Sequence, residues 1–179
     1  MKRFNLRALV FMALCCDLGM ISKKLISPAA NVITEFLHIP GGIATSFSLM
    51  FLVIAASVVS LPFCATLMGG VQSLLALILG TTGSMGIFAP IGYIMPGLVI
   101  DLVFLLWKKV SWDPPLGIML ASVAASVTAC LTANIIVFRL RGIILLLYVC
   151  VSATGGAICS LLANVLTERL RSMIKGELT

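Results

Sequence analysis

The chain has 179 residues, of which 61% are hydrophobic and only 10% charged, and its formal net charge is +6. A water-soluble domain of this length carries about a quarter charged residues, because its surface must be hydrated. The composition therefore excludes a soluble globule and predicts an all-α membrane protein embedded in a lipid bilayer. The basic residues gather at the ends of apolar runs, without the aromatic interleaving of a nucleic-acid surface, so no nucleic-acid partner is expected.

The pattern of apolar runs predicts one transmembrane domain over residues 1–179. No Asp, Glu, Lys or Arg occurs between Glu35 and Asp101, an interval longer than the roughly 20 residues that one helical crossing needs. Pro62 and the turn-forming residues 80–84 divide this interval. We predict a six-helix bundle with spans at about 6–22, 43–61, 63–79, 87–107, 115–138 and 142–166.

The first predicted connection, residues 23–42, contains two prolines and several apolar side chains. We expect a partly structured outer loop that packs back onto the bundle. Asn31, Glu35 and His38 are its candidate ligand contacts. As a hypothesis, this loop is a lid that orders when a ligand binds.

The distribution of basic residues predicts the orientation, because cytoplasmic loops are enriched in Lys and Arg. An even number of helices places both chain ends on one side. That side would hold eight basic residues: Lys2, Arg3, Arg7, Lys108, Lys109, Arg169, Arg171 and Lys175. The opposite side would hold four: Lys23, Lys24, Arg139 and Arg141. We therefore predict a multi-pass protein of the plasma membrane with both termini in the cytoplasm.

Motifs for soluble chemistry do not occur in the sequence. It has no nucleotide-binding motif, no catalytic triad or HExxH, and a single histidine. The six cysteines lie in apolar runs without metal-ligand spacing, so we expect no enzymatic activity, no metal and no cofactor. Ionisable groups within a membrane span are functional candidates, but for Asp17 we favour a structural ion pair and for Asp101 a structural or helix-packing role.

Several segments resemble those of a known family. They are Gly69–Gln72, the turn Gly80–Gly86, Tyr93–Asp101 and Phe104–Lys109. Together with six short helices and a basic N-terminus, they resemble the substrate-binding S components of energy-coupling factor (ECF) importers, particularly the branch linked to thiamin and its hydroxymethylpyrimidine precursor.

The resemblance implies a subunit that captures a micronutrient at the outer face and works with a transmembrane coupling protein and two cytoplasmic ATPases. Family pockets are lined by the first outer loop and the outer ends of helices four to six. Carried onto this chain, the candidate binding residues are Asn31, Glu35, His38, Thr81, Ser84, Met85, Tyr93, Asn134 and Arg139. Many members dock on the coupling protein through two alanines four apart in helix one. Here Ala8 and Ala13 are five apart, so docking is expected through Leu9 and Ala13.

Two other classes of function stay open at this point. The chain could be a membrane scaffold or assembly factor, or a small self-sufficient channel or carrier. The substrate is also open. A thiamin-related pyrimidine is the first expectation on resemblance alone, and a larger apolar ligand such as a porphyrin near His38 or a methionine is the alternative.

Overall fold

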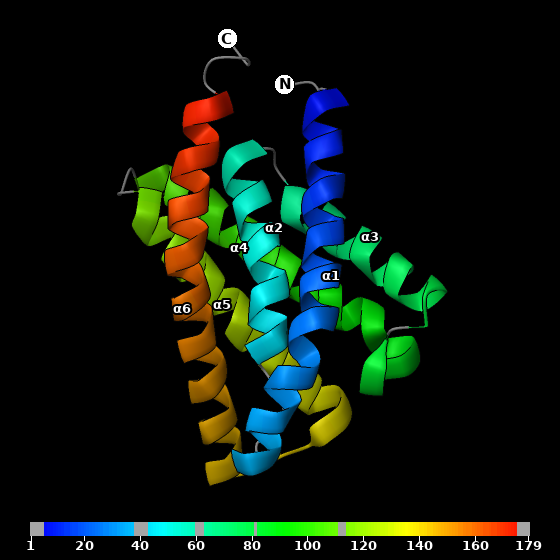
Figure 1. Cartoon of the computed structure of the whole chain (residues 1–179). Helices are drawn as coiled ribbons and strands as arrows, with labels where there is room; N and C mark the ends of the chain where they lie inside the picture. The colour runs from blue at the N-terminus through cyan, green and yellow to red at the C-terminus, as the bar shows by residue number, and fades with distance from the viewer. Residues whose placement is uncertain (1–5, 38–42, 60–62, 81, 111–113, 175–179) are drawn as a thin grey trace.

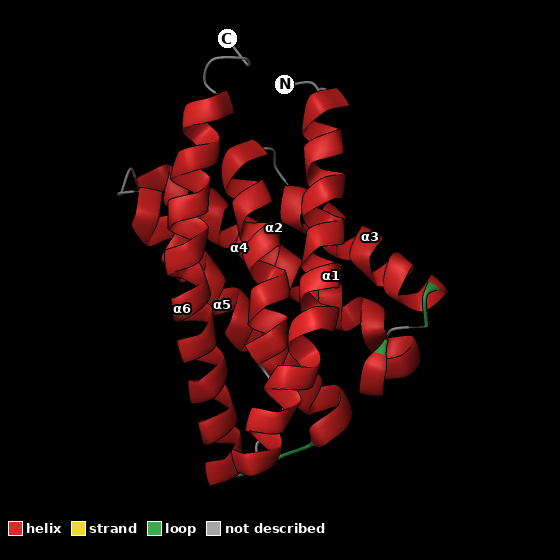
Figure 2. Cartoon of the chain, in the orientation of Figure 1, coloured by secondary structure: helices red, strands yellow, loops and turns green. Residues whose placement is uncertain are grey.

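A computed structural model of the chain describes residues 6–37, 43–59, 63–80, 82–110 and 114–174. Every regular element in these ranges is helical, which confirms the all-α prediction (Figure 2). The elements are α1 (Leu6–Leu37), α2 (Ile43–Val59), α3 (Cys64–Ile78), the short η1 (Gly83–Phe88), α4 (Ala89–Val110), α5 (Pro114–Ala133), η2 (Asn134–Phe138) and α6 (Ile143–Ile174).

Three helical stretches in the described part of the chain are long and apolar enough to cross a membrane: Met85–Trp107, Pro115–Phe138 and Ile143–Leu170. Two further apolar helices, Ala44–Val59 and Cys64–Ile78, are shorter. Many large apolar side chains on these helices are exposed, for example Ile78 and Leu161. Exposed apolar surface on this scale suits a lipid environment rather than water.

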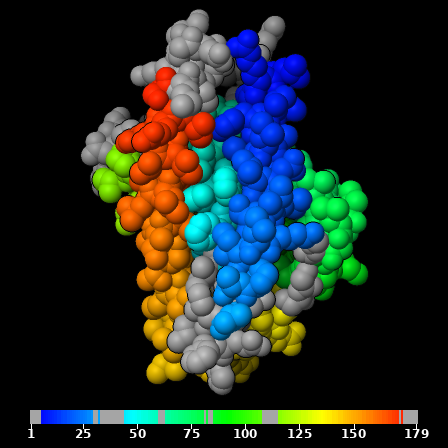
Figure 3. All heavy atoms as spheres, viewed as in Figure 1, coloured from blue at the N-terminus to red at the C-terminus, as the bar shows by residue number. Residues whose placement is uncertain are grey.

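Helix α2 occupies the centre of the bundle. It packs against α1, α5 and α6, while α4 packs between α3 and α5. The side chains of Leu52, Val53, Ile54 and Ala55 are at most 2% exposed. Figure 3 shows α2 as a strip between α1 and α6, which cover it from that side. The first turn of α1 and the last turn of α6 lie at the same end of the molecule (Figure 1).

Helix α1 is longer than the sequence pattern predicted. It runs without interruption over 32 residues and includes Pro28, so residues 23–37 are helical and the prediction of a loop there is wrong. At about 1.5 Å per residue its length is about 48 Å, more than the roughly 30 Å of a hydrocarbon core. A proline inside a helix removes one backbone hydrogen bond, and here that loss does not end the helix.

The predicted breaks between the middle helices are confirmed to within a few residues. Helix α2 ends at Val59 and α3 begins at Cys64. Helix α3 ends at Ile78, after which Gly80 adopts a φ of 62°, a left-handed conformation that glycine adopts without strain.

Small residues bring the backbones of α3 and α4 into close contact. A Cβ atom added at Gly69 would lie 2.5 Å from the carbonyl oxygen of Tyr93, and one added at Gly97 would lie 2.6 Å from that of Ala65. Small residues that permit close backbone approach are the usual means of helix association in lipid. Gly69 therefore serves the packing of α3 against α4.

Candidate functional site

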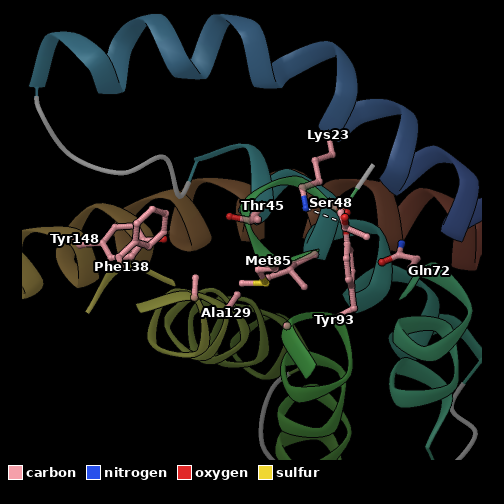
Figure 4. A pocket seen from close by; sticks show the side chains of 13 residues that line it. Lys23, Thr45, Ser48, Gln72, Met85, Tyr93, Ala129, Phe138 and Tyr148 are labelled. Atoms are coloured by element: carbon pink, nitrogen blue, oxygen red, sulfur yellow. Dashed lines mark hydrogen bonds between the residues drawn. The ribbon is translucent and has the colours of Figure 1, made fainter. Parts of the chain in front are cut away.

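A cavity of about 200 Å³ lies among the helices, in the half of the bundle away from the first turn of α1 and the last turn of α6. Side chains from all six long helices and both short ones line it (Figure 4). Its lining residues are Lys23, Thr45, Ser48, Leu49, Gln72, Thr82, Met85, Gly92, Tyr93, Ala129, Ala133, Phe138 and Tyr148.

One end of the cavity carries a positive charge. The Nζ atom of Lys23 donates a hydrogen bond of 3.0 Å to the hydroxyl of Tyr93 and lies 4.7 Å from the centre of its ring. Figure 4 shows Lys23 reaching from α1 toward Tyr93 on α4, with Ser48 beside them. None of the described residues that line the cavity is acidic.

The close packing of α1 against α2 and α3 positions this lysine. A Cβ atom at Gly19 would lie 2.9 Å from Nε2 of Gln72 and 3.2 Å from the carbonyl oxygen of Ser48. Gly19 and Lys23 are four residues apart, so they share one face of α1. The face that approaches α2 and α3 therefore also presents Lys23 to the cavity.

Gln72 links the polar end of the cavity to α1. Its side chain is 1% exposed, and Nε2 donates a hydrogen bond of 3.2 Å to the carbonyl oxygen of Cys16. A buried amide that is held by such a bond has a defined orientation. Figure 4 shows its amide oxygen on the side of Tyr93, where it adds an acceptor to the polar end.

The opposite end is apolar and aromatic. The rings of Phe138 and Tyr148 meet edge to face, with centroids 6.0 Å apart and an interplanar angle of 85°. Figure 4 places this pair on the far side of Met85 and Ala129 from Lys23. Met85 lies close against α4, because a Cβ atom at Gly92 would be only 2.5 Å from its sulfur. The cavity therefore has one polar, cationic end and one aromatic end.

The structure brings together only part of the site expected from the sequence. Met85 and Tyr93 line the cavity. The side chains of Asn31, Glu35 and Ser84, and the whole of His38 and Thr81, lie outside the described part of the structure.

Asn134 and Arg139 are not among the lining residues. The Oδ1 atom of Asn134 accepts a hydrogen bond of 2.7 Å from the backbone N–H of Leu140, and its carbonyl accepts one of 2.7 Å from the N–H of Arg139. Arg139 is exposed and has a φ of 50°. Asn134 thus holds the turn that ends η2, which is a structural role.

Sequence reasoning missed Lys23, Ser48, Gln72 and Tyr148 as members of the site. Two signals were present. Gln72 is the only Asn or Gln in the interval without charged residues, and the chain has just two tyrosines, both of which line the cavity. A polar residue inside an apolar helix is more often functional than the apolar residues around it.

The other residues singled out from the sequence lie elsewhere. Leu9 and Ala13 are exposed on α1. Asp17 is also exposed, and among the described residues it forms no ion pair within 4 Å. Asp101 has a structural role, since both of its carboxylate oxygens accept hydrogen bonds from the first turn of α3.

The arrangement is suited to binding a small molecule. Its described lining offers one ammonium group, hydroxyls, one amide and aromatic surfaces, which are the convergent polar groups and apolar walls of a small-molecule site. No set of three His, Cys, Asp or Glu side chains that could hold a metal occurs within the described ranges. Comparison of the chain with protein-family models, curated proteins and solved structures finds no match.

Proposed function

We propose that this chain is the membrane-embedded substrate-capture subunit of an ECF-type micronutrient importer, with six membrane crossings. The observation that carries the proposal is the cavity itself. It lies in the half of a lipid-exposed helical bundle that is away from both the start of α1 and the end of α6. With both termini cytoplasmic, as the basic residues favour, this half of the bundle lies toward the outer leaflet, where a captured solute would enter.

The six crossings of this proposal are assigned as follows. Three helical stretches meet the length of a full crossing, and α2 and α3 are shorter apolar helices. The apolar segment at residues 6–22 of α1 supplies the sixth crossing in this proposal. Continuation of α1 beyond Lys23 then extends it past the hydrocarbon core on the outer side, alongside the cavity.

The need for partner subunits follows from the sequence and from the exposed surface of α1. The sequence contains no nucleotide-binding motif, so concentrative uptake requires energy from partner ATPases. Leu9 and Ala13 are four apart and both exposed on α1, so they share a face that can contact a transmembrane coupling protein.

The binding step is tested by identifying the small molecule that the purified protein retains. Ala133→Trp fills the cavity, and Leu131→Trp on the exposed side of the same helix is the matched control. Mass spectrometry of denatured samples should find a small molecule in the parent and in Leu131→Trp but not in Ala133→Trp. The same amount of ligand in all three samples would contradict a binding role for the cavity.

The transport step is tested in proteoliposomes. The chain alone should bind its solute without concentrating it, and accumulation should appear only with a coupling protein and ATPases. Accumulation by the lone chain would instead support a self-sufficient carrier.

Orientation is tested by labelling single cysteines in intact cells with an impermeant maleimide. Of the native cysteines only Cys150 is exposed, so Cys150→Ser provides the background. Arg141→Cys should react and Lys175→Cys should not. The reverse pattern would place the cavity on the cytoplasmic side and contradict the capture role.

A further inference from the structure

The described lining of the cavity places no carboxylate beside the charge at its polar end. Lys23 is half-buried, and within the described ranges no carboxylate lies within 4 Å of its ammonium group. The hydrogen bond to Tyr93 uses one of the three N–H donors of the ammonium. A partly desolvated charge without a counterion is unfavourable, so an anion that enters the cavity is favoured by charge as well as by hydrogen bonding.

A lysine near the end of a membrane span often serves only to reach the interface. The neighbouring residue fits that role, because Lys24 is exposed and does not line the cavity. The Lys23 side chain points in a different direction from that of Lys24, into the cavity. It shares a face of α1 with Gly19, which packs against α2 and α3, and its ammonium contacts a residue of α4.

The size and polarity of the cavity restrict the anion further. An apolar cavity of about 150 Å³ in another protein accepts benzene, so about 200 Å³ has room for one ring and a small polar group. The edge-to-face pair Phe138 and Tyr148 forms the end opposite Lys23. A ligand ring that stacks on such a pair, or meets it edge-on, binds with a more favourable free energy than its buried area alone provides.

From these observations we infer that the ligand is a small monoanion, a single-ring carboxylate. Its carboxylate accepts hydrogen bonds from Lys23 and the hydroxyls near it, and its ring lies toward Phe138 and Tyr148. One cation balances one carboxylate, whereas phosphate sites usually combine several donors, arginine or a helix N-terminus. A thiamin-like ligand carries a fixed positive charge that Lys23 would repel. The inference rests on the proposed function and names the substrate class of the same cavity.

The test compares three probes of one shape and different charge: benzoate, benzamide and benzylammonium. Binding to the detergent-purified full chain is measured by calorimetric titration and by the rise in melting temperature. The parent should prefer benzoate over benzamide by about tenfold or more, since a hydrogen bond to a charged group is stronger than a neutral one. Benzylammonium should not bind.

Lys23→Met should remove the preference for benzoate, Lys23→Arg should keep part of it, and the control Lys24→Met should keep all of it. In the absence of ligand, Lys23→Met should melt at the same temperature as the parent or higher, because it removes an unbalanced charge. A purely structural lysine would give the opposite shift, a lower melting temperature.

Each other outcome has a defined meaning. If benzamide or benzylammonium binds as tightly as benzoate, or if Lys23→Met binds benzoate like the parent, the assignment of an anionic ligand is wrong. The proposed binding role of the cavity is not contradicted by that outcome. If none of the probes binds saturably while the purified protein retains a neutral or cationic molecule, the assignment is again overturned. If no probe binds and nothing is retained, the proposed capture function fails as well.

Discussion

The attachment of α3 to α4 through Asp101 leads to a quantitative prediction. Its Oδ1 atom accepts a hydrogen bond of 3.1 Å from the backbone N–H of Ala65. Its Oδ2 atom accepts one of 2.8 Å from the N–H of Thr66 and one of 2.6 Å from the Thr66 hydroxyl. Phe63, at the N-cap position of α3, has a φ of 60° and makes no side-chain capping bond. The carboxylate of Asp101, from α4, therefore accepts the backbone hydrogen bonds that an N-cap side chain would accept.

The expected cost of losing this carboxylate follows from its three bonds. Removing an N-cap costs about 0.5–2 kcal/mol, and a negative charge at a partly buried helix N-terminus contributes up to about 2 kcal/mol. Asp101→Ala should therefore lower the free energy of unfolding by about 0.5–4 kcal/mol. Asp101→Asn keeps one acceptor oxygen and should cost about 1–2 kcal/mol.

The measurement is thermal unfolding in detergent, followed by tryptophan fluorescence. For a chain of this size, a loss of 1 kcal/mol lowers Tm by about 2–4 °C, so Asp101→Ala should melt roughly 1–16 °C below the parent. Asp17→Ala is the matched control and should not lower Tm, because Asp17 is exposed and has no ion pair among the described residues. If both Asp101 variants melt like the parent, the carboxylate does not stabilise α3.

Three further predictions use contacts of single residues. Gly69→Ala should lower the free energy of unfolding by about 1–3 kcal/mol, because its Cβ would meet a backbone oxygen. The control Gly70→Ala would add a Cβ with nothing within 4 Å, so in the same melts the free energy of unfolding should stay equal or rise by up to about 1 kcal/mol. Asn134→Ala should cost about 1–2 kcal/mol in stability but leave ligand affinity within about twofold in titration, since its bonds hold a turn outside the cavity. Tyr93→Phe should weaken the binding of an anionic probe about two- to tenfold by releasing Lys23 from its hydroxyl partner; unchanged affinity would show that this bond does not position the ammonium.

Much of the fold could be predicted from the sequence, because helix formation in an apolar chain depends on local properties. The absence of charge from residue 36 to residue 100 indicates membrane-spanning helices, since only helices or closed barrels satisfy their backbone groups in lipid. Pro62 and the turn around Gly80 separate the middle helices within a few residues of where the structure ends and starts them. These features act over one or two turns, so no tertiary contact is needed to recognise them.

The continuity of α1 could not be predicted in the same way. Pro28 and the polar residues around it favour a break when they are considered locally, yet the helix runs from Leu6 to Leu37. The loop expected at residues 23–42 is therefore a helix over residues 23–37. Packing of α1 on α2 is the type of non-local contribution that overrides such local signals.

The membership of the site was decided by tertiary structure. Lys23, Gln72 and Tyr148 come from three helices and are 49 or more residues apart in successive pairs, and nothing local relates them. They converge because small residues set the helix spacing, with Gly19 against Gln72 and Gly69 against the backbone of Tyr93.

Asp101 shows the same division between local and non-local information. The sequence indicates that a carboxylate within an apolar helix needs a partner, and a structural role was expected for it. Only the fold shows that the partner is the first turn of α3, 35 residues earlier in the chain. The sequence alone determined that this protein is helical and apolar and where most of its helices end, because those properties depend on neighbouring residues. The tertiary structure decided which side chains meet, because that depends on the rotation and spacing of whole helices.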